Sequence, residues 1–234
     1  EWLSADSEWR DDSGGRLLMA AARSLVRPAG AVASLFGRPA RSLARWDAAA
    51  RARPVFALAA LDAHARIPWG DDAEPRRAGG LSFPGYEMMF RTAAQAVLLD
   101  QPLSGNPQDD ASRIMTAMVS GRTFAIVRAF ADPATLDFHG EKDGATVPMG
   151  GTVETDFAGV RLHAGVPGVP EAELMLMRDG QRVSAGKGSL AFAVTAPGVY
   201  RVEALYPGFP FPWLLSGAIR LGLGAPSIAP PTAQ

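Results

Sequence analysis

The sequence predicts an α/β segment followed by an antiparallel β-sandwich of immunoglobulin-like type, and three observations lead to this fold class. Residues up to about 120 are rich in Ala and Arg and space their apolar side chains as helices do. A continuous apolar run at 54–61 (PVFALAAL) is typical of a strand buried on both faces of a parallel sheet. Beyond 120 the chain is rich in Val, Thr and Gly in short, evenly spaced runs. We therefore expect domains at 1–120 and 121–224, and a disordered tail at 225–234.

Apolar spacing in the first half predicts four helices, over residues 16–26, 40–52, 85–99 and 109–120. In the second of these, Leu43, Trp46 and Ala50 recur at helical spacing and should form its buried face. In the fourth, Asp109 or Asp110 is the expected N-terminal cap.

The second half contains nine candidate strands, over residues 122–130, 134–139, 151–157, 159–165, 172–178, 181–185, 189–195, 198–206 and 213–221. Asp179-Gly180 is typical of a hairpin turn between two of them, and Gly121 is the expected stop of the helix that precedes the first. Apolar and polar residues alternate cleanly over 199–204 (VYRVEA), as in a strand with two different faces.

Composition narrows the possible functions. The chain has 234 residues, a formal net charge of −1 and 47% hydrophobic residues, so a sizeable core is expected and nucleic acid is not an expected partner. It has no cysteine, which excludes disulfides and thiolate metal ligands, and its three histidines are too few for an all-histidine metal site. No apolar run reaches the roughly 18 residues that a membrane-spanning helix needs.

Arginine is concentrated near the start of the chain. Residues 13–53 contain eight arginines and one acidic residue, Asp47. We favour the interpretation that these arginines form the solvated outer faces of helices, and a basic patch for an anionic partner is the alternative.

Asp62 and His64 are the strongest candidates for chemistry. They follow the predicted buried strand directly, and ligands bind beyond the carboxyl ends of such strands. A carboxylate and an imidazole suit Zn, Mn or Fe. The alternative is that Asp62 caps a helix and His64 is solvated.

Two weaker candidate groups remain. The first is an acidic cluster around Arg10, which could supply a carboxylate or a substrate contact but is more typical of a solvated loop; it consists of Asp6, Glu8, Asp11 and Asp12. The second is the pair His139 and His163, which we interpret as structural or surface residues.

Six segments resemble a known family in their order along the chain. They are Glu1–Asp12 (EWLSADSEWRDD), Arg45-Trp46-Asp47 followed by Ala60-Leu61-Asp62-Ala63-His64, Gly121-Arg122-Thr123-Phe124, Pro197–Glu203 (PGVYRVE) and Pro212–Ser216 (PWLLS). Together they resemble the C-terminal part of PHP (polymerase and histidinol phosphatase) domain metallohydrolases, in the CehA/McbA-like branch.

The resemblance implies the C-terminal portion of a distorted (β/α) PHP barrel with a multinuclear metal site at the strand ends. Carried over by residue, it makes Asp62 and His64 metal ligands. Arg10 lies in the first matching segment, and we expect it to contact an anionic group of the substrate. The ions would be Zn, Mn or Fe. Most of their ligands, beginning with an H-x-H pair, would lie outside this chain, which starts at Glu1 and is interpreted as a fragment.

The sequence departs from the family pattern where Ala60 and Leu61 replace Gly and Ser, and where Gly217 and Ala218 replace Asn and Pro.

The expected function is metal-dependent hydrolysis of a small-molecule ester, with phosphoesters the first substrate class by analogy. Residues 1–234 alone are expected to be inactive, because two protein ligands hold a metal poorly. The alternative is a non-catalytic binding or structural module with a degenerate PHP remnant and a β-sandwich. Nucleic-acid binding through the Arg-rich half is a weaker third possibility.

Overall fold

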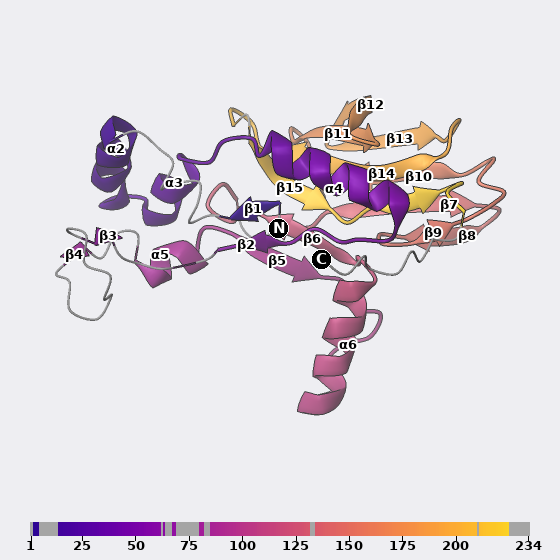
Figure 1. The fold of residues 1–234 in the computed structure, drawn as a ribbon, viewed down its shortest axis with the longest axis horizontal. Coiled ribbons are helices and arrows are strands. Elements are labelled where there is room, and N and C mark those ends of the chain that lie inside the picture. The colour runs from indigo at the N-terminus through magenta and orange to yellow at the C-terminus, as the bar shows by residue number, and fades with distance from the viewer. Residues whose placement is uncertain are drawn as a thin grey trace, which may run out of the picture.

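The computed structural model describes residues 2–4, 14–61, 63, 67–68, 80–81, 85–131, 134–209 and 211–224. It is a mixed α and β structure with one large sheet flanked by helices (Figure 1). The described helices are α2 (Gly14–Ser24), α3 (Pro28–Ala33), α4 (Ala40–Ala52), α5 (Tyr86–Phe90) and α6 (Pro107–Val119).

The large sheet has twelve strands. They are β5 (Ala94–Val97), β6 (Thr123–Ile126), β7 (Asp137–Lys142), β8 (Ala145–Pro148), β9 (Thr152–Val153), β10 (Arg161–Gly165), β11 (Glu173–Arg178), β12 (Gln181–Lys187), β13 (Ser189–Ala193), β14 (Gly198–Leu205), β15 (Pro212–Ser216) and β16 (Ile219–Leu221). Two small sheets pair β1 (Leu3–Ser4) with β2 (Ala59–Ala60) and β3 (Ile67–Pro68) with β4 (Gly80–Leu81).

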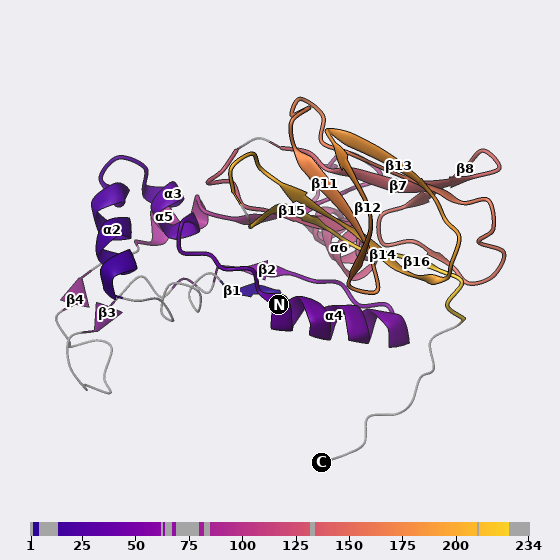
Figure 2. The same ribbon diagram turned by 90° about the horizontal axis from the view of Figure 1, so that it is seen from above.

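The large sheet folds over into two layers (Figure 2). Its strand order is β5-β6-β15-β14-β11-β12-β13-β10-β7-β8, and β16 links β14 to β9. The sheet passes from one layer to the other where Lys187 of β12 pairs with Ser189 of β13. Phe192 on β13 packs against Tyr200 on β14, which is not its neighbour in the sheet, with ring centroids 6.3 Å apart. This contact therefore joins the inner faces of the two layers, and the apolar core lies between them.

The described strands close no barrel. The parallel pairs among them are β1 with β2 and β9 with β16, and the other pairs are antiparallel. Of the run 54–61, which was predicted to be a strand buried on both faces, Ala59–Ala60 forms β2 and the side chains of 55–61 are only half-buried.

The prediction of a helix over 40–52 is confirmed by α4, and Leu43, Trp46 and Ala50 are buried on it. The prediction of a helix over 85–99 is wrong beyond α5. Residues 94–97 form β5, which pairs with β6 from Ala94↔Ile126 to Val97↔Thr123. An Ala-rich run has helical propensity, but pairing with a buried strand overrides it.

Helix α6 begins two residues before the predicted start. Its N-cap is Asn106, whose side chain accepts hydrogen bonds from the amides of Gln108 and Asp109, so the predicted cap by Asp109 or Asp110 is wrong. Asp110 instead accepts hydrogen bonds from the amides of Ser104 and Gly105. Pro107 occupies the first helical position, which needs no amide donor.

The predicted stop at Gly121 is confirmed. Its φ is +72°, and the amides of Gly121 and Arg122 donate to the carbonyl oxygens of Met118 and Ala117, as in a Schellman motif. The Asp179-Gly180 hairpin turn is also confirmed, since both residues have positive φ, as a type I′ turn requires.

Replacement of the helix cap tests this description of α6. In Asn106→Ala the first-turn amides lose their acceptor, so helix stability should fall by about 1 kcal/mol. Hydrogen exchange should be faster at the amides of Gln108 and Asp109, whereas Asn106→Asp should exchange like the unaltered protein. Equal exchange in Asn106→Ala and Asn106→Asp would contradict the capping role.

Candidate functional site

The parallel pair β1–β2 is the part of the fold nearest in sequence to the predicted metal ligands. The amide of Trp2 donates to the carbonyl oxygen of Leu58 at 3.0 Å, and Leu3 is in register with Ala59. Trp2 and Leu3 are buried, which anchors β1 in the core. The amide of Ala59 donates to the side-chain oxygen of Gln95 on β5 at 3.2 Å, which ties β2 to the large sheet.

The predicted site residues Asp62, His64 and Arg10 lie outside the described residues, as do Asp6, Glu8, Asp11 and Asp12. What is described is the chain that leads to them. In sequence, Asp62 and His64 follow the end of β2, and Arg10 follows the end of β1. Ala63, between Asp62 and His64, is partly buried against the core. The structure therefore defines the two strands that precede the predicted ligands.

Within the described part of the chain, no group of three or more His, Cys, Asp and Glu side chains is arranged to hold a metal ion. The nearest approach to such a group surrounds the two histidines of the large sheet. His139 on β7 faces His163 on β10, with ring centroids 5.3 Å apart and planes at 17°. The Nδ1 atom of His139 lies 2.9 Å from a carboxylate oxygen of Asp137.

The Glu141 carboxylate approaches both rings, with one oxygen 3.5 Å from the Nε2 atom of His139 and the other 3.5 Å from that of His163. We interpreted these histidines from the sequence as structural or surface residues. That interpretation overlooked Asp137 and Glu141, which lie two positions to either side of His139. The alternation of side chains along β7 puts those residues on the same face, which is the signal that could have found the cluster.

A buried network of charges joins α4 to the large sheet. Arg201 on β14 donates through Nε and Nη2 to the two carboxylate oxygens of Asp47 on α4, at 2.8 and 2.9 Å. Arg201 also donates through Nη1 to Glu203, and Arg38 donates to the same carboxylate from just before α4. The side chains of Arg201 and Glu203 are 2% and 0% exposed. The pair Arg201 and Glu203 is therefore withdrawn from water, whereas the side chain of Arg38 is 40% exposed.

The pKa values of Glu203 and Arg201 are set by the residues that they contact in the network. Burial by itself raises the pKa of Glu203, but the hydrogen bond from Arg38 and the charge of Arg201 outweigh burial and hold that pKa below its usual range. Burial likewise works to lower the pKa of Arg201, and its bonds to Asp47 and Glu203 reverse the effect and raise the pKa. Arg201 and Glu203 are therefore both charged at neutral pH.

The network was not expected from the sequence. The guanidinium of Arg201 also lies 5.1 Å from the ring of Trp46, a cation–π contact. Trp46-Asp47 and Arg201-Val202-Glu203 belong to two of the segments that carry the family resemblance, and the structure brings them into contact. The alternation over 199–204 places polar residues on one face as predicted, but that face is covered by α4 and not by water.

A cavity of about 500 Å³ lies beside the network, between α4 and the β11–β12 hairpin. Arg51 closes one side of it by pairing with Asp179 at the hairpin turn. At Gly180 a Cβ atom would lie 2.8 Å from a carboxylate oxygen of Asp47, so the turn approaches the network closely. The charged groups around this cavity largely satisfy one another, which leaves little unneutralised charge for a ligand.

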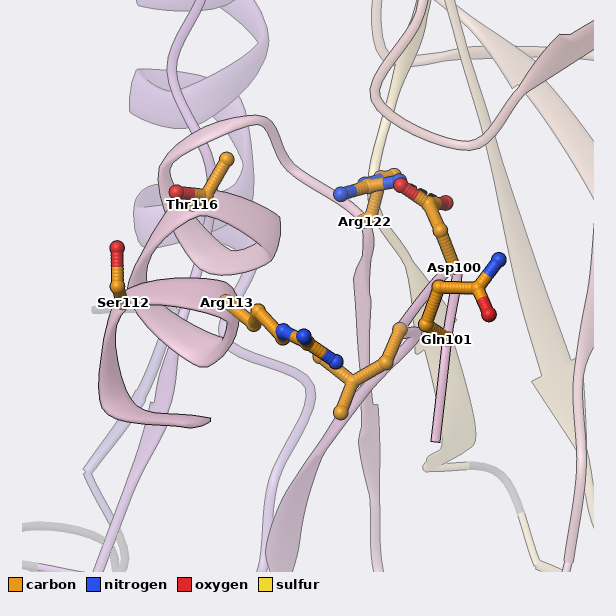
Figure 3. Close-up of a pocket in the computed structure, with 7 residues that line it drawn as sticks. Asp100, Gln101, Ser112, Arg113, Thr116 and Arg122 are labelled. Carbon is orange, nitrogen blue, oxygen red and sulfur yellow. Dashed lines mark hydrogen bonds and ion pairs between the residues drawn. The ribbon is translucent and has the colours of Figure 1, made fainter. Parts of the chain in front are cut away.

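A second pocket, of about 340 Å³, lies between α6 and the segment that follows β5 (Figure 3). Arg113 and Arg122 point into it from opposite sides (Figure 3). Arg122 pairs with Asp100, and Arg113 donates to the carbonyl oxygen of Pro102 at 3.1 Å. Because Asp100 neutralises Arg122, this pocket has less unneutralised positive charge than two arginines suggest.

No described helix is long and apolar enough to cross a lipid bilayer. In comparisons with known proteins, no family model, no curated protein and no solved structure matched this chain.

The buried network gives a testable difference between two aspartates. Asp47→Ala leaves Arg201 buried without its main partner, so the free energy of unfolding should fall by about 3 kcal/mol. Asp100→Ala breaks an exposed pair with Arg122 and should cost roughly 0.5 kcal/mol. Denaturant unfolding measures both values, and equal losses would show that the network is not the contact that holds α4.

The lowered pKa of Glu203 predicts a pH dependence. Its pKa in the folded state lies below the unfolded value of about 4.3, so its contribution to stability is fully present above that pH and is lost as the pH falls through the folded value. Stability should therefore decrease below pH ~4 less steeply in Glu203→Gln than in the unaltered protein. Identical slopes in denaturant unfolding between pH ~2 and ~5 would contradict this assignment.

Proposed function

We propose that this chain is part of a metal-dependent hydrolase of the PHP type that acts on a small-molecule phosphoester or other ester. The proposal includes the finer architecture: β1, α4 and β2 as the end of a distorted (β/α) barrel, and the two-layered sheet as an immunoglobulin-like sandwich. The hydroxyl of Tyr200 donates to the carbonyl oxygen of Ala196 four residues upstream, a contact that also occurs in the tyrosine corner of such sandwiches and supports the second assignment.

One observation carries the functional proposal: β1 and β2 are parallel neighbours, and the chain between them contains α2, α3 and α4. The carboxyl ends of parallel neighbours meet at one edge of their sheet, where ligands bind in α/β folds. The segments that follow these two ends in sequence contain the candidate residues Arg10, Asp62 and His64. Described geometry and sequence order together therefore support one site at that edge.

Each candidate residue has a role in this proposal. Asp62 holds or bridges metal ions, His64 ligates one of them through a ring nitrogen, and Arg10 pairs with an anionic oxygen of the substrate. A bound divalent metal supplies a water whose pKa is lowered toward ~7. The donors fit Zn, Mn or Fe in kind, but two are fewer than a metal site needs, so the proposal requires further ligands besides Asp62 and His64.

A second candidate function is a non-catalytic binding or structural module. It is favoured by the buried network between α4 and β14, which makes the helix part of the sheet's framework. In that case the segments that resemble the PHP family serve to hold the fold together, and any ligand occupies a cavity elsewhere.

The hydrolase proposal is tested by metal content and turnover of the intact protein. Asp62→Ala and His64→Ala should each lower bound metal, measured by plasma mass spectrometry, and reduce hydrolysis of p-nitrophenyl phosphate by about 100-fold or more. Arg10→Ala should raise KM for the phosphate ester and leave the metal content unchanged. p-Nitrophenyl acetate as a second substrate distinguishes phosphoester from carboxylic-ester hydrolysis.

His139→Ala is the matched control, because it removes a histidine from the large sheet and should preserve both metal and turnover. Metal content that is unchanged in both ligand variants would overturn the assignment of Asp62 and His64. An intact protein with neither bound metal nor turnover would favour the binding module.

A further inference from the structure

The largest of the described cavities, about 950 Å³, lies where α2 and α3 meet one end of the large sheet. Figure 1 shows this group of helices beyond the sheet's end, joined to α4 by a single segment. Four arginines line the cavity from three separate parts of the chain; they are Arg23, Arg27, Arg91 and Arg128. Its volume is within the range of small-molecule sites.

The charged side chains among the described walls of this cavity are all basic. None of the described residues that line it is acidic. Glu87 pairs with Arg91 at 3.0 Å, but both side chains are largely exposed and Glu87 does not line the cavity. Guanidinium groups stay charged at all physiological pH values, so Arg23 and Arg27, which lie together on one wall, attract an anion. No carboxylate lies among the described walls beside them, whereas aspartates line the two cavities above.

One wall of the cavity is aromatic. Phe130 and Phe209 are stacked with ring centroids 4.3 Å apart, and Tyr206 lies 6.2 Å from Phe209. Tyr206 also packs edge-on against the buried Trp213, which joins this wall to the core. Rings held in this way offer a rigid apolar surface that a flexible aliphatic wall does not.

Backbone hydrogen bonds hold the walls in place. The amide of Ala129 donates to the carbonyl oxygen of Thr92 at 3.1 Å, which joins the segments that bear Arg128 and Arg91. The amide of Phe209 closes a turn onto the carbonyl oxygen of Tyr206 at 3.0 Å. The cavity is therefore largely formed before any ligand arrives, which reduces the entropy cost of binding.

We propose that this cavity is a binding site for a small organic anion, a carboxylate, sulfonate or phosphate joined to an aromatic or other compact apolar body. Arg23 and Arg27 bind the charged group, and Phe130, Tyr206 and Phe209 bind the apolar body. The proposal does not rest on the hydrolase, because it involves neither Asp62 nor His64.

Titration calorimetry with three probes tests the site. Naphthalene-1-sulfonate, which no hydrolase cleaves as an ester, should bind more tightly than neutral naphthalene-1-methanol or inorganic phosphate. The double variant Arg23→Gln/Arg27→Gln should weaken sulfonate binding by about tenfold, and raised NaCl should weaken it in the unaltered protein. Phe209→Ala should weaken binding of the sulfonate more than that of phosphate.

The matched control is Arg41→Gln/Arg53→Gln, which removes the same charge from exposed positions that do not line the cavity. Equal sulfonate binding by the two double variants would overturn the proposal, and so would the absence of sulfonate binding by the unaltered protein. If naphthalene-1-methanol bound as tightly as the sulfonate, the cavity would recognise only the apolar body, which also overturns the proposal. Preferential binding of hexaglutamate would indicate an acidic peptide partner instead, which also overturns it.

Discussion

The buried contact between Asp47, Arg201 and Glu203 is the constraint on which much of this structure depends. A charge removed from water is tolerated only where opposite charges and hydrogen bonds replace the lost hydration. Arg201 meets that condition with two carboxylates, one of them on a helix 154 residues earlier in the chain. If α4 lay elsewhere, Asp47 and Arg201 would each be buried without the other's opposite charge. The network therefore fixes the placement of α4 on β14.

The placement of α4 has consequences at both of its ends. Before it, Arg38 reaches Glu203. After it, the chain returns to form β2 beside β1. In the chain, the segment that lines the arginine cavity enters this helix, and the segment that leaves it ends in β2. The network therefore fixes the helix that joins these two described segments.

The arginines of the first half differ in which groups they face in the folded chain. Arg38 and Arg51 pair with carboxylates, whereas Arg23 and Arg27 line a cavity without acidic side chains among its described walls. The sequence interpretation favoured a solvated helix face for the whole group and kept an anionic partner as the alternative. Which arginines are neutralised within the chain depends on what faces each guanidinium across the fold.

Local sequence determined the elements whose signals are local. The spacing of Leu43, Trp46 and Ala50 predicted α4 and its buried face, and Asp179-Gly180 and Gly121 predicted their turns, because helical periodicity and positive φ depend on a few adjacent residues. It also placed Asp62 and His64 after a strand, which remains the basis of the proposed metal site. Only the tertiary structure decided that 94–97 is a strand, that His139 and His163 face each other, and that Arg201 is buried against Asp47. Each of these depends on a partner far along the chain or on another strand, and a linear pattern cannot specify which partner that is.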